Sequence, residues 1–346
     1  MRNIRKIAGV ILSAMLLGGL PSLAWTAAAT LPQTIDSGPG AMSWTVTNFG
    51  GTDINGVCDG LSDGMAIDDA TSANGAVNAF DTAYQVYIDD QIFIAPDPVD
   101  RSANVITAGP IPAGAPNLQA TVEYLFSDRV QAARIRVIFE NASGNPIDTR
   151  VDIPVNFGSD ANTAINATSS GDQIFGINDR WLVTSDGVPA VAPVNSTVFF
   201  GPDNPAEKPT ATTQTVCEDD KMSTEGAGVT FNVTIPANST RSLMFFAGLG
   251  DIEGLDNTVA GAIANVMMFD DPATIDNSLV DDLSGTEWEE TLNWRYIRAD
   301  AIGIGDGKGG SNGCTVQGSR SADPLFPVLL AGLSLLFFYR RRLHKR

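Results

Sequence analysis

The chain has 346 residues, of which 40 are acidic and 21 basic, so its formal net charge is -19. The imbalance is greater between residues 30 and 314, where 39 acidic residues accompany only 12 basic ones. A surface of this charge repels nucleic-acid phosphates and anionic lipid headgroups, so no nucleic-acid partner is expected.

The N-terminal segment has the pattern of a secretory signal peptide. Three basic residues lie within the first six positions, and an uncharged apolar run follows at residues 7–20. Small residues come next, up to Ala29, and signal peptidase prefers small residues before its cut. The apolar run is shorter than the ~20 residues of a membrane span. We therefore expect residues 1–29 to be a signal peptide that is removed near Ala29.

Strand patterns dominate the following part of the chain. They are expected at residues 43–49, 84–95, 118–126, 133–140, 147–157, 181–184, 197–200, 229–235 and 241–247. In residues 147–157, apolar side chains such as Val151 and Val155 alternate with polar ones such as Asp148. Turn-forming residues separate this segment from residues 133–140, which predicts an antiparallel hairpin.

Two short helices are expected later in the chain. Residues 255–268 place four apolar side chains on one helical face: Leu255, Val259, Ile263 and Met267. Ser284 and Glu287 have the spacing of a capping box that opens a helix through residue 292. Both helices are expected to cover an end of a sheet.

The many strands and few helices predict an all-β fold, an antiparallel β-sandwich with minor helices near its C-terminal end. The ectodomain, residues 30–305, is longer than one sandwich of about 100 residues, so one enlarged or two tandem sandwiches are open. We favour one, because a disulfide between Cys58 and Cys217 would join its halves. The Pro- and Gly-rich residues 108–116 are the boundary if there are two.

The C-terminal tail has three parts in fixed order. A Gly-rich linker at residues 306–324 precedes an apolar run at residues 325–339 and a basic tail at residues 340–346. As a helix, the run is roughly 22 Å long, a marginal transmembrane helix against a hydrocarbon core of ~30 Å. The basic tail would remain cytoplasmic, which places the preceding chain outside the membrane.

This order resembles bacterial C-terminal sorting signals of the PEP-CTERM, GlyGly-CTERM and MYXO-CTERM kind. The resemblance lies in the glycines, the cysteine, Asp323-Pro324, the apolar run and the arginines. It implies that a sorting intramembrane protease cuts near Gly313, Cys314 and Thr315, and that Cys314 could carry a lipid. The alternative is a plain transmembrane anchor with an incidental cysteine. Both interpretations place an exported protein at the cell surface, anchored to the membrane before any processing.

A second resemblance concerns the ectodomain. Residues 135–141, 155–160, 169–172, 179–181 and 229–250 are similar to a module of bacterial surface proteins with interchangeable anchors. This resemblance supports a surface location and implies no activity.

The cysteines suggest one disulfide. If Cys314 belongs to the sorting signal, Cys58 and Cys217 remain to pair in an oxidising compartment, although two free thiols are the alternative. The pair would close a loop of about 160 residues and stabilise the fold by ~4–5 kcal/mol.

Candidate sites are few, because the one histidine, His344, lies in the basic tail. The ectodomain therefore cannot form a Ser-His-Asp or Cys-His arrangement or a histidine-ligated zinc site. A structural calcium site is a hypothesis, with these candidate ligands in a Gly-bearing segment: Asp59, Asp63, Asp68 and Asp69. The alternative is a solvated loop, and no other cofactor is expected.

Three functions are consistent with these patterns. The first is a structural or adhesive surface protein without a catalytic site, which requires no special residues. The second is a carbohydrate-binding module, whose sugar platform would use four tryptophans: Trp44, Trp181, Trp288 and Trp294. Each lies in or beside an apolar pattern, however, and core packing is the commoner fate of such residues. The third is a histidine-free hydrolase with paired carboxylates.

Overall fold

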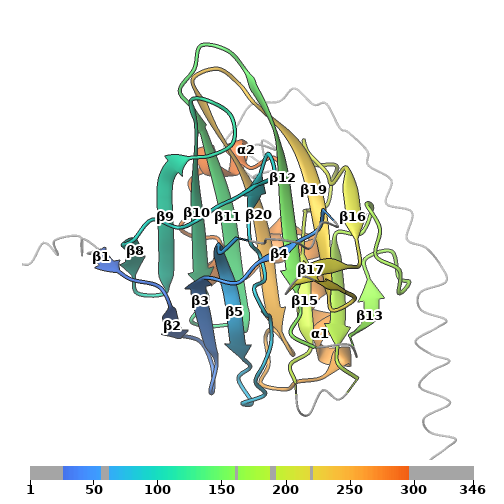
Figure 1. Cartoon of the computed structure of the whole chain (residues 1–346). Helices are drawn as coiled ribbons and strands as arrows, with labels where there is room; N and C mark the ends of the chain where they lie inside the picture. Colours follow the sequence, from blue (N-terminus) through green and yellow to red (C-terminus); the bar gives the residue numbers. More distant parts are fainter. Residues whose placement is uncertain (1–25, 56–61, 160–162, 188–191, 219–220, 296–346) are drawn as a thin grey trace, which may run out of the picture. The chain divides into compact units, whose positions relative to one another are not determined.

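The computed structural model describes residues 26–55, 62–159, 163–187, 192–218 and 221–295 (Figure 1). Most of the predicted signal peptide and the whole sorting tail therefore lie outside the described residues. Within the described ranges, no helix has the length and apolar character that crossing a membrane requires. The predicted transmembrane helix at residues 325–339 stays a prediction.

The largest layer is an antiparallel sheet of nine strands within the described part of the chain. Its central strands are long, and the outer ones on each side are shorter (Figure 1). The strand order is β1 (Ala27–Ala29), β8 (Val99–Ser102), β9 (Val105–Pro112), β10 (Leu118–Phe126), β11 (Ala132–Asn141), β20 (Ser239–Leu249), β15 (Asn195–Val198), β14 (Trp181–Ser185) and β13 (Ala164–Thr168).

Two smaller sheets form the facing layer. One contains β16 (Ala211–Thr213), β19 (Gly226–Ile235), β12 (Ile147–Asn156), β6 (Tyr87–Ile88) and β7 (Gln91–Ile92), and the other contains β2 (Gln33–Asp36), β3 (Ser43–Asn48) and β5 (Met65–Thr71). Residues 79–84 join them: Ala83 exchanges backbone hydrogen bonds with Ile67 on β5, and the Tyr84 amide donates to Pro154 on β12. A third small sheet is made of β18 (Lys221–Ser223), β17 (Val216–Glu218) and β4 (Thr52–Asp53).

The main core lies between the two layers. Trp44 of β3 packs on Phe126 of β10 with ring centroids 5.5 Å apart, and Phe231 of β19 packs on Phe245 of β20 at 5.9 Å. Large aromatic side chains contribute much of the apolar area that such a core removes from water. The prediction of an all-β antiparallel fold is therefore confirmed.

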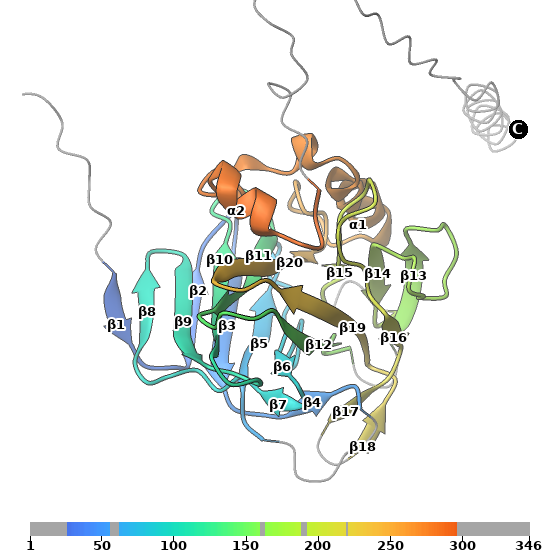
Figure 2. The same ribbon diagram turned by 90° about the horizontal axis from the view of Figure 1, so that it is seen from above.

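A helical cap covers the other face of the nine-stranded sheet (Figure 2). It comprises α1 (Val259–Val266), α2 (Gly285–Glu290) and the 3₁₀ turns Met267–Asp270, Pro272–Thr274 and Asn277–Leu279. The Phe246 ring of β20 packs on Phe269 and Trp294, with ring centroids 4.6 and 5.2 Å apart. These residues are part of a second core between the sheet and the cap. The helices thus cover a sheet face, and not a sheet end as the sequence analysis predicted.

The predicted apolar face of the first helix is only partly confirmed, because Val259 and Ile263 pack against the second core as half-buried residues. Leu255 and Met267 are exposed, and the buried helical residues are Ala262 and Val266. The helix begins only after Thr258, whose side chain accepts a hydrogen bond from the Gly261 amide. The most deeply buried helical positions, Ala262 and Val266, therefore each lie one residue before a predicted apolar position, Ile263 or Met267.

The predicted hairpin between residues 133–140 and 147–157 is not formed. β11 pairs with β10 and β20, whereas β12 pairs with β19 and β6 in the facing layer. The β11–β12 and β19–β20 connections both cross between layers, side by side (Figure 1). Asn141 joins them, since its Nδ2 donates to the carbonyl oxygens of Ile235 and Pro236, each at 3.0 Å. We call these two connections the double arch, residues 142–146 and 236–238.

Two further expectations change in the structure. The segment 84–95 is no single strand, because Asp89 and Asp90 have positive φ and close a tight β6–β7 hairpin. Residues 108–116 are no domain boundary, because they lie in β9 and the turn after it. The described residues belong to one compact unit.

Candidate functional site

Charged side chains lie between the nine-stranded sheet and the cap. Successive residues of a strand face opposite sides, so Ile135 and Val137 of β11 enter the main core while Arg134 and Arg136 face the cap. Glu123 of β10 is the direct cross-strand partner of Arg136. With two cap residues these groups form the charge cluster: Glu123, Arg134, Arg136, Asp282 and Glu287.

Arg134 is the most deeply buried charged residue of the cluster, with a side chain that is 0% exposed. Its guanidinium donates to both carboxylate oxygens of Asp282, at 2.6 and 2.7 Å. It also donates to Glu123 at 2.8 Å and to the Leu279 carbonyl oxygen at 2.7 Å. This bidentate ion pair fixes the orientation of Arg134 and Asp282 relative to each other, so it holds the cap segment on β11.

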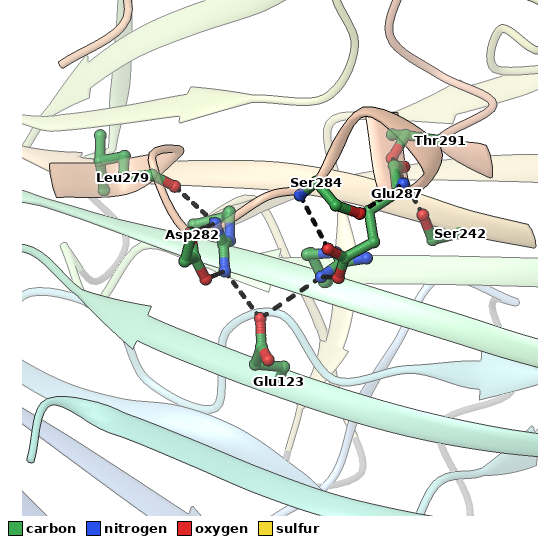
Figure 3. Close-up of polar contacts among 9 residues, drawn as sticks. Glu123, Ser242, Leu279, Asp282, Ser284, Glu287 and Thr291 are labelled. Atoms are coloured by element: carbon green, nitrogen blue, oxygen red, sulfur yellow. Dashed lines mark hydrogen bonds and ion pairs between the residues drawn. The ribbon is translucent and has the colours of Figure 1, made fainter. Parts of the chain in front are cut away.

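Arg136 contacts the second helix through a single ion pair. Its Nη1 donates to Glu287 at 2.8 Å and lies 3.9 Å from Glu123. The other Glu287 oxygen accepts from the Ser284 amide at 2.9 Å, and the Glu287 amide donates to the Ser284 hydroxyl at 3.2 Å. Both contacts of the predicted capping box are thus confirmed, and Figure 3 shows Glu123 on the sheet facing Asp282 and Glu287 of the cap.

These contacts shift the pKa values of two residues of the cluster, Arg134 and Glu287. Burial disfavours the charged form of Arg134, but its hydrogen bond with Asp282 and the charge of Glu123 outweigh burial and raise its pKa. Burial likewise opposes ionisation of Glu287, yet the hydrogen bonds from Ser284 and Arg136 hold its pKa below the usual value. Both shifts favour the charged form that the ion pairs of Arg134 and Glu287 require, which suits a structural role.

A second set of acidic groups lies in the facing layer. Asp152 of β12 is 1% exposed, pairs with Arg150 at 2.9 Å and accepts from the Thr230 hydroxyl of β19 at 2.5 Å. Asp53 of β4 is also buried, and its carboxylate and that of Asp152 repel each other. Burial raises the pKa of both groups, because desolvation disfavours a carboxylate.

One depression lies beside the double arch. It has a volume of about 560 Å³, is wide open to solvent, and is lined by Glu140, Asn141, Ala142, Asn238, Ser239, Thr240 and Glu290. Its lining is polar, and it carries two carboxylates.

The predicted calcium ligands are only partly placed. Asp59 lies outside the described residues, while Asp63 accepts a hydrogen bond from the Gly50 amide at 3.3 Å. Asp68 and Asp69 lie in strand β5, where Asp68 is the extra residue of a bulge, and not in the loop that the sequence suggested. In the described part of the chain no group of three or more His, Cys, Asp or Glu residues could hold a metal ion. The calcium site stays a hypothesis.

The hypothesis of a tryptophan platform is not supported, and the alternative of core packing is confirmed. The exposed fractions are 0% for Trp44, 5% for Trp181, 8% for Trp288 and 2% for Trp294. Their rings fill the two cores, and the indole N–H groups of Trp181 and Trp294 donate to Asp270 and to the Met244 carbonyl. They offer no stacking face to a sugar.

Of the three cysteines, only Cys217 lies within the described residues. Cys217 of β17 is buried and disulfide-bonded, but its partner lies outside the described residues, as does Cys58. The Cys58–Cys217 pairing therefore stays a prediction. Gly313, Cys314 and Thr315 of the predicted sorting motif also lie outside the described residues.

Sequence reasoning missed the charge cluster. The available signal was Arg134 and Arg136 at alternate positions of a predicted strand, on the face opposite to its apolar residues. That pattern normally indicates a solvated face. The cap that buries this face lies more than a hundred residues further along the chain, and no local pattern reveals where it packs.

Comparisons with known proteins add no family. No family matches the sequence, and no curated protein matches it either. Among solved structures, a galactose mutarotase-like protein from Lactobacillus casei is 10% identical with a TM-score of 0.35, over 65% of this chain and 100% of that chain. Heparan sulfate lyase HepC from Pedobacter heparinus is 10% identical with a TM-score of 0.34, over 66% and 37%. A TPR-domain containing protein from Parabacteroides distasonis is 10% identical with a TM-score of 0.36, over 62% and 46%. Similarity at this level identifies neither a family nor an activity.

Proposed function

We propose that the chain is an exported bacterial cell-surface protein whose β-sandwich is a structural or adhesive module without catalytic activity. The signal-peptide pattern and the sorting-signal resemblance of the tail support export and surface attachment. The absence of catalytic activity in this proposal is supported by the contacts of the buried charged residues. Arg134, Arg136 and Asp152 are engaged in ion pairs and hydrogen bonds within the fold, where they join strands and layers.

Export and attachment are tested in the native organism. Cells are fractionated, intact cells are treated with an external protease, and the mature chain from membranes and medium is analysed by intact mass. We expect protease-accessible protein that lacks its first residues and is cut near Gly313. Full-length protein in the cytosol would contradict the proposal.

A Cys314→Ala variant examines the sorting signal separately. If the cysteine marks the processing point, this variant keeps its tail and accumulates in the membrane. A Cys314→Ala chain that is processed like the wild type would instead support a plain anchor with an incidental cysteine.

The two alternative functions, a hydrolase and a carbohydrate-binding module, can both be tested at the depression beside the double arch. Paired-carboxylate hydrolysis requires two acids about 5 to 9.5 Å apart. Glu140 and Glu290 are the acids that line the depression. Hydrolysis of a glycan by the exported protein, abolished by Glu140→Gln or Glu290→Gln, would replace our proposal. A defined hit on a glycan array without hydrolysis would instead favour a carbohydrate-binding module that uses polar residues in place of the tryptophans.

A further inference from the structure

The first described strand falls inside the predicted signal peptide. β1 (Ala27–Ala29) is the edge strand of the nine-stranded sheet and pairs with β8, with Ala27 opposite Arg101 and Ala29 opposite Val99. Cleavage after Ala29 would remove β1 from the mature protein. The backbone groups of β8 on that side would then form an open sheet edge, which favours pairing with other chains.

The segment around β1 also joins the two layers of the sandwich. After β1 the chain passes to β2, which pairs with β3 in the facing layer. Ala29 and Leu31 pack against the main core, and the Arg101 guanidinium of β8 donates to the side-chain oxygen of Gln33 on β2. β1 is therefore part of the fold, and its loss would expose one edge of the nine-stranded sheet.

The sequence contains a second cleavage pattern just before this strand. Signal peptidase requires small residues at the last and third-last positions before the cut. Ala27 and Ala29 meet this requirement for a cut after residue 29, and Ser22 and Ala24 meet it for a cut after residue 24. Of the two positions, only the second leaves β1 in the mature chain.

We propose that signal peptidase hydrolyses the Ala24–Trp25 bond, so that the mature protein begins at Trp25 and keeps β1. Water adds across this peptide bond and leaves a carboxylate on Ala24 and a free amine on Trp25. The inference rests on the proposed export of the chain. It changes the expected signal peptide from residues 1–29 to residues 1–24.

The test is to identify the N-terminus of the exported protein. Free amines are labelled chemically before digestion, and the labelled N-terminal peptide is sequenced by mass spectrometry. We expect a peptide that begins at Trp25. One that begins at Thr30, or at any other cleaved position, would overturn this inference and leave export intact. A chain that still begins with its uncut first residues would overturn both.

Two matched variants separate the cleavage positions. Ala24→Leu places a large side chain before the proposed cut, and we expect the Trp25 N-terminus to be lost. Ala27→Leu alters an exposed residue of β1 and should keep the Trp25 N-terminus. If processing were instead blocked by Ala27→Leu and unaffected by Ala24→Leu, the cut would lie after Ala29 and the inference would be wrong.

Discussion

Asp282→Ala should destabilise the attachment of the cap to the nine-stranded sheet. The substitution removes two of the four hydrogen bonds that the buried Arg134 guanidinium donates, those at 2.6 and 2.7 Å. Breaking a buried ion pair by removing one partner typically costs about 3–5 kcal/mol, because the remaining charge is stranded. Asp282 is itself 50% exposed, and Arg134 keeps Glu123, so solvent screening reduces the effect. We expect a loss of about 2–3 kcal/mol in the free energy of unfolding.

The measurement is denaturant unfolding of the purified protein, followed by tryptophan fluorescence. Trp288 and Trp294 pack in the core between sheet and cap, so they report on this region directly. Asp281→Ala is the matched control, because it removes the same charge from the exposed neighbouring residue. The control should change stability by no more than about 0.5 kcal/mol.

A double variant distinguishes a stranded charge from a simple sum of lost contacts. In Arg134→Met, Asp282 can be solvated by water, and the Glu123 carboxylate still lies 3.9 Å from Arg136 Nη1. The substitution should therefore lower the free energy of unfolding by only about 1–2 kcal/mol. Adding Asp282→Ala to Arg134→Met should then cost little more, because no buried cation remains. The reasoning is refuted if Asp282→Ala behaves like its control, or if the two single effects add in the double variant.

Three further predictions concern other parts of the fold. Asn141→Ala removes the side chain that joins the double arch and should cost about 2–3 kcal/mol in denaturant unfolding, whereas Asn145→Ala, at an exposed arch residue, should be near neutral. Ser284→Ala removes the N-cap of α2 and should cost about 1 kcal/mol, measured in the same way. Desolvation raises the pKa of Asp53, so the folded protein holds this proton more tightly than the unfolded chain, and the stability it contributes is lost as the pH rises through the folded pKa. Asp53→Asn should therefore raise the melting temperature at pH 7 and lose that advantage near pH 3; an equal shift at both pH values would contradict this assignment.

The local features of this protein were predictable from its sequence. Two-residue alternation identified β12 and the inward face that includes Val151 and Val155, because side-chain direction in a strand depends only on the local backbone. The Ser284–Glu287 spacing identified the start of α2 for the same reason, since both partners of the capping box lie within one helical turn. The all-β class followed from many such local patterns.

Which elements pack against one another could not be predicted from the sequence. β11 and β12 are adjacent in the chain but lie in opposite layers, because Asn141 and the neighbouring connection fold the chain into an arch, and strand periodicity carries no information about partners. The burial of Arg134 was equally hidden, because its ion pair with Asp282 spans 148 positions in the chain. Trp181 could have been a surface residue or a core residue, and its packing beneath the cap settled the choice. In each case the deciding energy comes from contacts between segments far apart in sequence, which no local pattern records.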